Sequence, residues 1–176
     1  MKNALLFLYI IISVNTYAQL QPELEFVCEL KVSTEKAMIL GQTTHGERRI
    51  IPITGGTFDG PLLKGTVLNG GADYQYFTQN SNGESRTEIE AIYTVKTDDG
   101  VLIHIRNVGL VSRTKEQNEA QKAGTPIDFS KIYFRAAPKF DAPTESKYNW
   151  MNNAIFICKG IPTGQGFVRI LVWKVL

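Results

Sequence analysis

The sequence predicts an all-β protein, a single closed or nearly closed antiparallel barrel with one short helix. Short runs rich in Ile, Leu, Val, Thr and Tyr recur along the chain, which is typical of strands. Eight of the fifteen glycines fall between Gly41 and Gly71, where they separate such runs. Because glycine is favoured at turns and bends, this spacing indicates strands that turn back on one another.

The first half of the chain supplies five expected strands. Residues 24–32 alternate apolar with mostly charged side chains, which predicts a half-buried strand. Shorter strands are expected at residues 37–40, 49–53, 66–68 and 74–78. The turn signal Asn69-Gly70-Gly71 separates the last two.

The second half contains the clearest hairpin, in which Thr97-Asp98-Asp99-Gly100 joins strands expected at 88–96 and 101–108. Residues 112–123 are the helical candidate, with Gly124 as its stop and Pro126 beyond it. Further strands are expected at residues 131–136, 154–159 and 167–175.

The N-terminus has the pattern of an export signal. Lys2 precedes an apolar stretch at residues 4–14, and Thr16-Tyr17-Ala18 offers small residues where a signal peptidase cleaves. The stretch is short for a bilayer about 30 Å thick, although a membrane anchor is the alternative. We expect a signal peptide at 1–18, cleavage after Ala18, a single barrel domain at 19–176, and a periplasmic or secreted protein.

The charge balance argues against several partners. The chain has 19 Lys and Arg against 17 Asp and Glu, for a formal net charge of +2. Without Lys2 the excess is about +1, which predicts no strong attraction to nucleic acid or to a membrane surface. A homodimer is compatible with a barrel, which can associate through an edge or an outer face.

Cys28 and Cys158 are the two cysteines. In an oxidising compartment they could form a disulfide between the first and penultimate β segments. Cys28 also shares the apolar parity of Leu24, Phe26 and Leu30, which favours a buried free thiol. The sequence leaves both readings open.

Several common motifs are missing. The chain has no GxGxxG, GxSxG, HExxH or CxxC pattern, and its two histidines, His45 and His104, are too few for a histidine-rich metal site. Asp98-Asp99-Gly100 lacks the ligand spacing of a calcium loop and is interpreted as a turn. We therefore expect no metal and no cofactor.

Strand parity offers candidate site residues. Along residues 88–96 one face carries Glu88 and Glu90, and the other carries Ile89, Ala91 and Tyr93. The 102–107 and 131–136 segments alternate in the same way. The polar faces either contact water outside the barrel or contribute to a ligand site at its mouth, because parity alone does not say which face points inward.

Three ordered segments resemble a known family. They are GERRIIPITGGTFDGPLLKGTVLNGGADYQYF, IEAIYTVKTDDGVLIHIRNVG, and YFRAAPKF followed by YNWMNNAIF. Together they resemble the domain-of-unknown-function family 3237 over nearly the whole chain from about Phe26. The resemblance implies a calycin/lipocalin-like barrel with no assigned general activity. The polar signature of that family is matched at Arg48, Asp73, Tyr93, Asn107, Gly109, Arg135 and Tyr148. The sequence departs from it at Tyr74, where tryptophan is expected, and at Ile92, where arginine is expected.

These residues define the expected site. Asp73 and Arg135 form its polar core, in which Arg135 holds an anionic or carbonyl oxygen and Asp73 orients it or acts as a base. Glu90 is the second candidate catalytic carboxylate. The candidate ligand-binding residues are Arg48, Tyr93, Asn107, Tyr133, Arg135, Tyr148 and Trp150.

Three functions are compatible with that site. The leading hypothesis is binding of a small, anionic or carbonyl-bearing molecule at the barrel mouth. The alternative is a cofactor-independent isomerase, cyclase or hydrolase that uses a pocket carboxylate. The third is a structural or interaction protein whose polar faces contact solvent.

Overall fold

The computed structural model describes residues 21–164 and 166–176. The expected signal peptide at 1–18 lies outside the described residues. The strands are β1 (Leu24–Thr34), β2 (Met38–Thr43), β3 (Gly46–Asp59), β4 (Gly65–Val67), β5 (Gly71–Gln79), β6 (Ser85–Thr97), β7 (Leu102–Arg113), β8 (Tyr133–Asp141), β9 (Phe156–Pro162) and β10 (Phe167–Val175). The helices are α1 (Lys115–Ala123) and the 3-10 turns η2 (Phe129–Lys131) and η3 (Asn149–Asn153).

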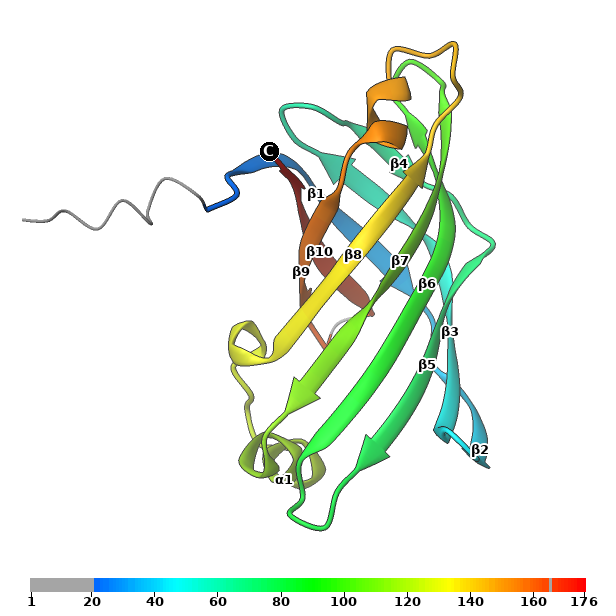
Figure 1. Ribbon diagram of the computed structural model, residues 1–176. Helices are drawn as coiled ribbons and strands as arrows, with labels where there is room; N and C mark the ends of the chain where they lie inside the picture. The colour runs from blue at the N-terminus through cyan, green and yellow to red at the C-terminus, as the bar shows by residue number, and fades with distance from the viewer. Residues whose placement is uncertain (1–20, 165) are drawn as a thin grey trace, which may run out of the picture.

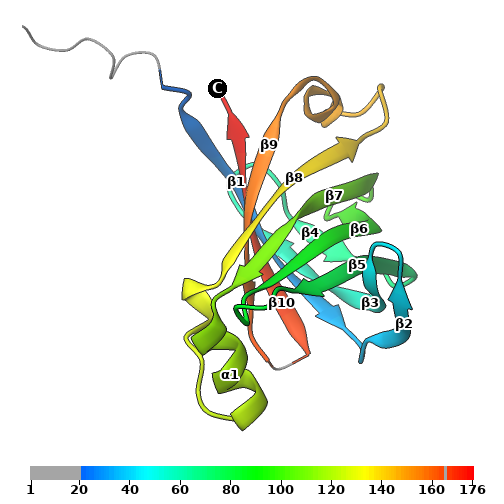
Figure 2. The same cartoon turned by 60° about the horizontal axis from the view of Figure 1, so that its bottom comes forward.

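The sheet closes on itself, which confirms the predicted all-β barrel (Figures 1 and 2). Successive antiparallel pairings run from β1 through β10, β9, β8, β7, β6 and β5 to β3, and β3 pairs with β1 again. The short β4 bridges β3 and β6, and β2 extends β3 as a hairpin. A closed ring leaves few free edges.

Glycine in β3 permits the closure. The first part of β3 pairs with β5, and its second part pairs with β1. Near the start of the second part, Gly55 and Gly56 have φ of 145° and 136°, a conformation that other residues rarely adopt. A Cβ atom at Gly56 would lie 2.0 Å from the Lys31 carbonyl oxygen, so the two strands approach this closely only at glycine.

The apolar parity of the strands points into the barrel. Ile89, Ala91, Tyr93 and Val95 of β6 are buried, whereas their neighbours are exposed or only partly buried. The same alternation buries Ile103 and Ile105 of β7, and Ile132, Phe134 and Ala136 at β8. Charged side chains such as Arg106 consequently lie outside.

The two ends of the barrel differ. The turn η3 lies at one end, drawn in orange at the top of Figure 1, and α1 lies at the other. At the η3 end Met151, Phe156 and Phe140 are buried, and the rings of Phe140 and Phe156 stack edge to face with centroids 4.7 Å apart. That end is therefore packed, and the α1 end is the one available for a cavity.

The helix begins later than the sequence predicts. Ser112 and Arg113 continue β7, where they pair with Arg86 and Ser85, so the expected helix at 112–123 is shortened to α1. The Thr114 side chain accepts a hydrogen bond from the Gln117 amide and caps the helix. Within residues 21–164 and 166–176, no helix combines the length and apolar character needed to cross a membrane.

The two cysteines are free, so the disulfide reading is wrong. Cys28 of β1 and Cys158 of β9 both pair with Val172 of β10, from opposite sides. Two strand spacings amount to about 10 Å, which exceeds the roughly 4.4–6.8 Å between Cα atoms that a disulfide allows. Both thiols are buried.

Candidate functional site

A cavity of about 350 Å³ occupies the barrel interior toward the α1 end. Its wall combines aliphatic side chains and two phenylalanine rings with polar side chains from five strands, α1 and the β9–β10 loop. The apolar lining residues are Val32, Ile51, Ile53, Ile89, Ala91, Val111, Phe134, Pro162, Phe167, Val168 and Ile170. An apolar chamber with a few convergent polar groups is typical of a small-molecule site.

Asp73 provides the carboxylate of this cavity. It lies on β5 opposite Ala91 of β6, and its Oδ2 accepts a 2.6 Å hydrogen bond from the Gln75 side-chain amide. Its Oδ1 is buried and has no hydrogen-bond partner. Burial raises the pKa of Asp73 to about 6, against the hydrogen bond from Gln75 and a smaller effect of the Glu90 backbone, which both lower it.

Tyr93 and Asn107 lie on neighbouring strands of the same wall. Ala91 of β6 pairs with Asp73 of β5 on one side and with Asn107 of β7 on the other, so Asp73 and Asn107 lie at the same level of the barrel. Tyr93 lies two residues after Ala91 on β6. Burial raises the pKa of the Tyr93 phenol, so the side chain is neutral. The Asn107 side-chain nitrogen lies 3.6 Å from the sulfur of Cys158, which connects this wall to β9.

Two arginines lie at the α1 end of the cavity. Arg49 forms an ion pair with Glu47, and its guanidinium carbon lies 4.1 Å from the Phe77 ring centroid. Arg113 donates a 2.6 Å hydrogen bond from Nη1 to Gln121 of α1, while its Nε is buried without a partner. Burial, and then the positive charge of Arg49, lower the pKa of Arg113.

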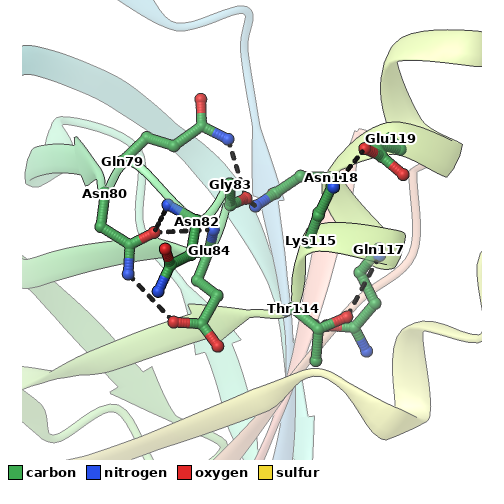
Figure 3. A network of polar contacts seen from close by, with 10 residues as sticks. All are labelled: Gln79, Asn80, Asn82, Gly83, Glu84, Thr114, Lys115, Gln117, Asn118 and Glu119. Carbon is green, nitrogen blue, oxygen red and sulfur yellow. Dashed lines mark hydrogen bonds and ion pairs between the residues drawn. The ribbon is translucent and has the colours of Figure 1, made fainter.

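The helix that carries Gln121 is held by a polar network (Figure 3). Asn118 donates a 2.9 Å hydrogen bond to the Gly83 carbonyl and accepts one of 3.0 Å from Ser85. On the other side of Gly83, the Asn80 side chain accepts hydrogen bonds from the amides of Asn82 and Glu84. These contacts fasten α1 to the β5–β6 turn beside the cavity.

Asp73, Tyr93 and Asn107 are the sequence-predicted site residues that the structure brings together at the cavity. Glu90 does not join them, because it has the opposite parity on β6 and forms a 2.7 Å ion pair with Arg106 on the outer face. The expected pairing of Asp73 with Arg135 is also not formed.

Arg135 lies on the outside of β8, as does Tyr133, because Phe134 and Ala136 take the inward positions. Its guanidinium donates a 2.9 Å hydrogen bond to the Phe134 carbonyl and lies over the Tyr133 ring. Arg135 and Asp73 therefore occupy opposite sides of the barrel wall.

Arg48 is on the outer face of β3, where its guanidinium lies over the rings of Tyr74 and Tyr76. Tyr148 and Trp150 belong to the packed η3 end. The Tyr148 hydroxyl donates a 2.9 Å hydrogen bond to Asp99 of the β6–β7 hairpin, and Trp150 packs against Phe156. None of these three lines the cavity.

Sequence reasoning missed Arg49, Gln75, Arg113 and Gln121. Arg49 shares the parity of Ile51 and Ile53, and this signal could have placed it inside the barrel in preference to Arg48. Arg113 was missed because the sequence placed it in the expected helix at 112–123, whereas it is the last residue of β7. Among the residues that the structure describes, no group of three His, Cys, Asp or Glu side chains is placed to hold a metal ion.

Comparison with known proteins agrees with the fold. The family model for "Protein of unknown function (DUF3237)" matches residues 22–175. The chain belongs to this family. An UPF0311 protein of Clostridium acetobutylicum is 36% identical over 135 residues, which cover 76% of this chain and 82% of the relative. A UPF0311 protein of Rhodopseudomonas palustris is 38% identical over 117 residues, which cover 66% of this chain and 73% of the relative.

Solved structures of similar proteins show a similar barrel. A protein with unknown function from Clostridium acetobutylicum superposes with a TM-score of 0.76 at 32% identity, covering 89% of this chain and 100% of that one. A β-barrel-like protein from Acinetobacter baumannii superposes with a TM-score of 0.74 at 32% sequence identity. The superposition covers 92% of this chain and 100% of that one.

One relative carries an activity in its name. A hydroalkoxylation enzyme of Penicillium herquei is 29% identical over 132 residues, which cover 75% of this chain and 70% of that protein. A solved enzyme from the same organism superposes with a TM-score of 0.55 at 25% identity, over 88% of this chain and 95% of that one.

Proposed function

We propose that this protein binds a small organic molecule inside the barrel and that Asp73 exchanges a proton with a carbonyl, hydroxyl or anionic oxygen, or an adjacent carbon, of that molecule. The observation that carries the proposal is the buried, unpartnered Oδ1 of Asp73 at the wall of the cavity. An unpaired buried polar atom is costly to folding, and such atoms are concentrated at functional sites.

The protonation state of Asp73 suits this role. With a pKa of about 6, the carboxyl exchanges between its acid and base forms close to neutral pH, which is the condition for efficient proton transfer. The Gln75 hydrogen bond holds Oδ2, and Oδ1 has no protein partner. The apolar wall keeps the reacting group away from bulk water.

The Penicillium relative supports proton-transfer chemistry over binding alone. A hydroalkoxylation adds the O–H bond of an alcohol across a carbon–carbon double bond, so that one C–O bond and one C–H bond form while the O–H bond and the π bond of the alkene break. Such a reaction needs a group that moves a proton, and it consumes no oxidant or reductant. We extend to this chain the reaction class, a cofactor-independent proton transfer, and leave the substrate to be identified by experiment.

Deuterium exchange tests the proposal. The purified protein is incubated in D₂O with a panel of hydroxylated aromatic compounds and unsaturated ketones, and carbon-bound deuterium is measured by mass spectrometry. The wild type should label at least one compound at a rate that changes near pH 6. Asp73→Asn should abolish labelling while the compound still binds, and the outer-face variant Glu90→Gln should label normally.

Two results would count against catalysis. Equal labelling by wild type and Asp73→Asn would remove Asp73 from the chemistry. Tight binding without labelling by either protein would leave the barrel as a binding protein, the second candidate, which the mostly apolar lining of the cavity favours.

A further inference from the structure

We infer that the molecule bound in this cavity is an amphiphilic oxyanion, with a carboxylate or similar head held by Arg113 and Arg49 at the mouth and an aryl or short alkyl body extending inward toward Asp73. The inference rests on the proposed function, because it concerns the same cavity. It adds the chemical class of the ligand and the direction in which it enters.

The mouth has an excess of positive charge. Arg49 and Arg113 both border the cavity, and Glu47 pairs with Arg49. Arg113 forms no ion pair with any described residue, and its Nη1 is taken by the neutral amide of Gln121. Two cations with one carboxylate leave one charge uncompensated beside a partly enclosed space, where an anion is strongly favoured.

Arg113 also has a free donor in the right place. Its Nε is buried and lacks an acceptor, although the guanidinium is a cavity-lining group. An N–H bond to a carboxylate oxygen would satisfy that atom with a charge-assisted hydrogen bond, which is among the stronger kinds. A neutral carbonyl oxygen would satisfy the same donor without neutralising the charge.

Asp73 lies far along the strands from Arg113. Arg49 is closer, opposite Gln75 in the β3–β5 register, and its guanidinium lies over the Phe77 ring. Arg113 lies six residues along β7 from Asn107, and Asn107 is in register with Ala91 and Asp73. Burial and hydrogen bonds account for the pKa of Asp73, with no contribution from either arginine. A ligand that contacts both Arg113 and Asp73 must therefore place its anionic head and its reacting group at opposite ends.

The cavity wall between Arg113 and Asp73 determines the polarity and size of the ligand's body, the part between its anionic head and its reacting group. Ile51, Ile89, Val111 and Val168 line it together with the Phe134 ring. Gln75 and Thr87 add two polar side chains to this mainly apolar stretch. The cavity of about 350 Å³ is roughly twice the size of an apolar protein cavity that accommodates benzene. A body of one or two rings, or a short alkyl chain, matches this space.

A matched pair of probes tests the inference. The carboxylate 4-phenylbutanoate and its neutral amide, 4-phenylbutanamide, differ in the charge of the head and share the body. Binding of both to the full chain is measured by calorimetry near neutral pH at low salt. We expect the carboxylate to bind at least about tenfold more tightly than the amide, as one charge-assisted hydrogen bond allows.

Four variants identify the groups responsible. Arg113→Gln should bring the two probes to nearly equal affinity, whereas the outer-face control Arg135→Gln should leave the preference unchanged. Glu47→Gln should increase the preference severalfold, because it frees the charge of Arg49; this variant also tests the mouth if Arg113→Gln fails to fold. Asp73→Asn should keep the preference, since Asp73 lies at the other end.

The outcomes separate the two proposals. Equal affinity of the wild type for both probes, or an unchanged preference in both Arg113→Gln and Glu47→Gln, overturns the oxyanion inference and leaves the small-molecule cavity standing. Failure of both probes to bind contradicts the inference, whereas the deuterium-exchange panel decides the proposed function separately. Loss of deuterium labelling in Asp73→Asn with the carboxylate preference intact supports both.

Discussion

The side-chain amide of Gln75 donates a 2.6 Å hydrogen bond to Oδ2 of Asp73, and Oδ1 of the same carboxyl is buried without a partner. The two residues lie two positions apart on β5 and point into the same cavity. A carboxyl held at one oxygen has a restricted orientation, and its unpaired oxygen is the one that can carry the proton. Because Oδ1 is buried without a hydrogen-bond donor, ionised Asp73 destabilises the folded protein.

Asp73→Asn should therefore stabilise the protein at neutral pH. The pKa of Asp73 is about 6 in the folded protein against an ordinary value of 3.8, so the folded state binds the proton more tightly than the unfolded state does. The contribution of Asp73 to the free energy of unfolding is therefore most favourable at low pH, where the carboxyl is protonated in both states. It becomes less favourable as the pH rises from 3.8 to about 6, and it stays at that lower value above pH 6. The neutral amide avoids this loss, so we expect a gain of about 1–3 kcal/mol near pH 8.

Denaturant unfolding at several pH values measures this effect. The difference in the free energy of unfolding between Asp73→Asn and wild type should shrink toward zero as the pH falls to about 4, because Asp73 is then neutral in the folded protein. Glu90→Gln is the control, since Glu90 forms its ion pair on the outer face. A variant that is less stable than wild type near pH 8 would show that the carboxylate is satisfied when ionised.

The strands were predictable because each buries one face. Alternation in β6 and β7 follows directly from inward Ile89, Ala91 and Ile105, and the Asp98-Asp99-Gly100 turn joins the strands as expected. The closure of the ring was harder to read, since β3 pairs with β5 and then with β1 through a bend at Gly55 and Gly56. Glycine signalled a bend there without indicating which strand lies beyond it.

The site was predictable only in part, because a shift of one residue along a strand moves a side chain to the other face. Asp73 was placed at the cavity, yet Arg48 was chosen in preference to its neighbour Arg49, which is the arginine that lines it. Arg135 was chosen because it matches the polar signature of the family, although the apolar Phe134 beside it takes the inward position. Electrostatic effects across the barrel, such as that of the Arg49 charge on Arg113, depend on closure and leave no local pattern in the sequence.

The thiols should be unreactive in the folded protein. Burial raises the pKa of Cys28 to about 12 and that of Cys158 to about 11, so neither forms the thiolate that reacts with alkylating reagents. Iodoacetamide should leave the native protein unmodified at mildly alkaline pH and should modify both cysteines in denaturant. An intact mass that rises by two hydrogens on reduction would reveal a disulfide and contradict the strand register.

We propose that the protein is exported, and processing of its N-terminus tests this. Expression of the full chain in a bacterium with a general secretion pathway should yield a protein that begins at Gln19, as read by mass spectrometry of the periplasmic or extracellular fraction. Replacing Ala18 with a bulky residue, as in Ala18→Trp, should block cleavage at that site. A cytoplasmic protein that retains the hydrophobic segment at residues 4–14 would contradict the proposal.

Gly160→Ala should displace the Phe134 ring that walls the cavity. A Cβ atom at Gly160 would lie 2.3 Å from two atoms of that ring, well inside van der Waals contact, so the ring or the strand must move. Overpacking of this kind costs about 1–3 kcal/mol. In a Phe134→Leu background the same substitution should cost clearly less, because the obstructing ring is gone and alanine is better suited than glycine to a strand interior. Denaturant unfolding of the four proteins gives the coupling between the two positions; an equal cost in both backgrounds would show that the contact does not shape the wall.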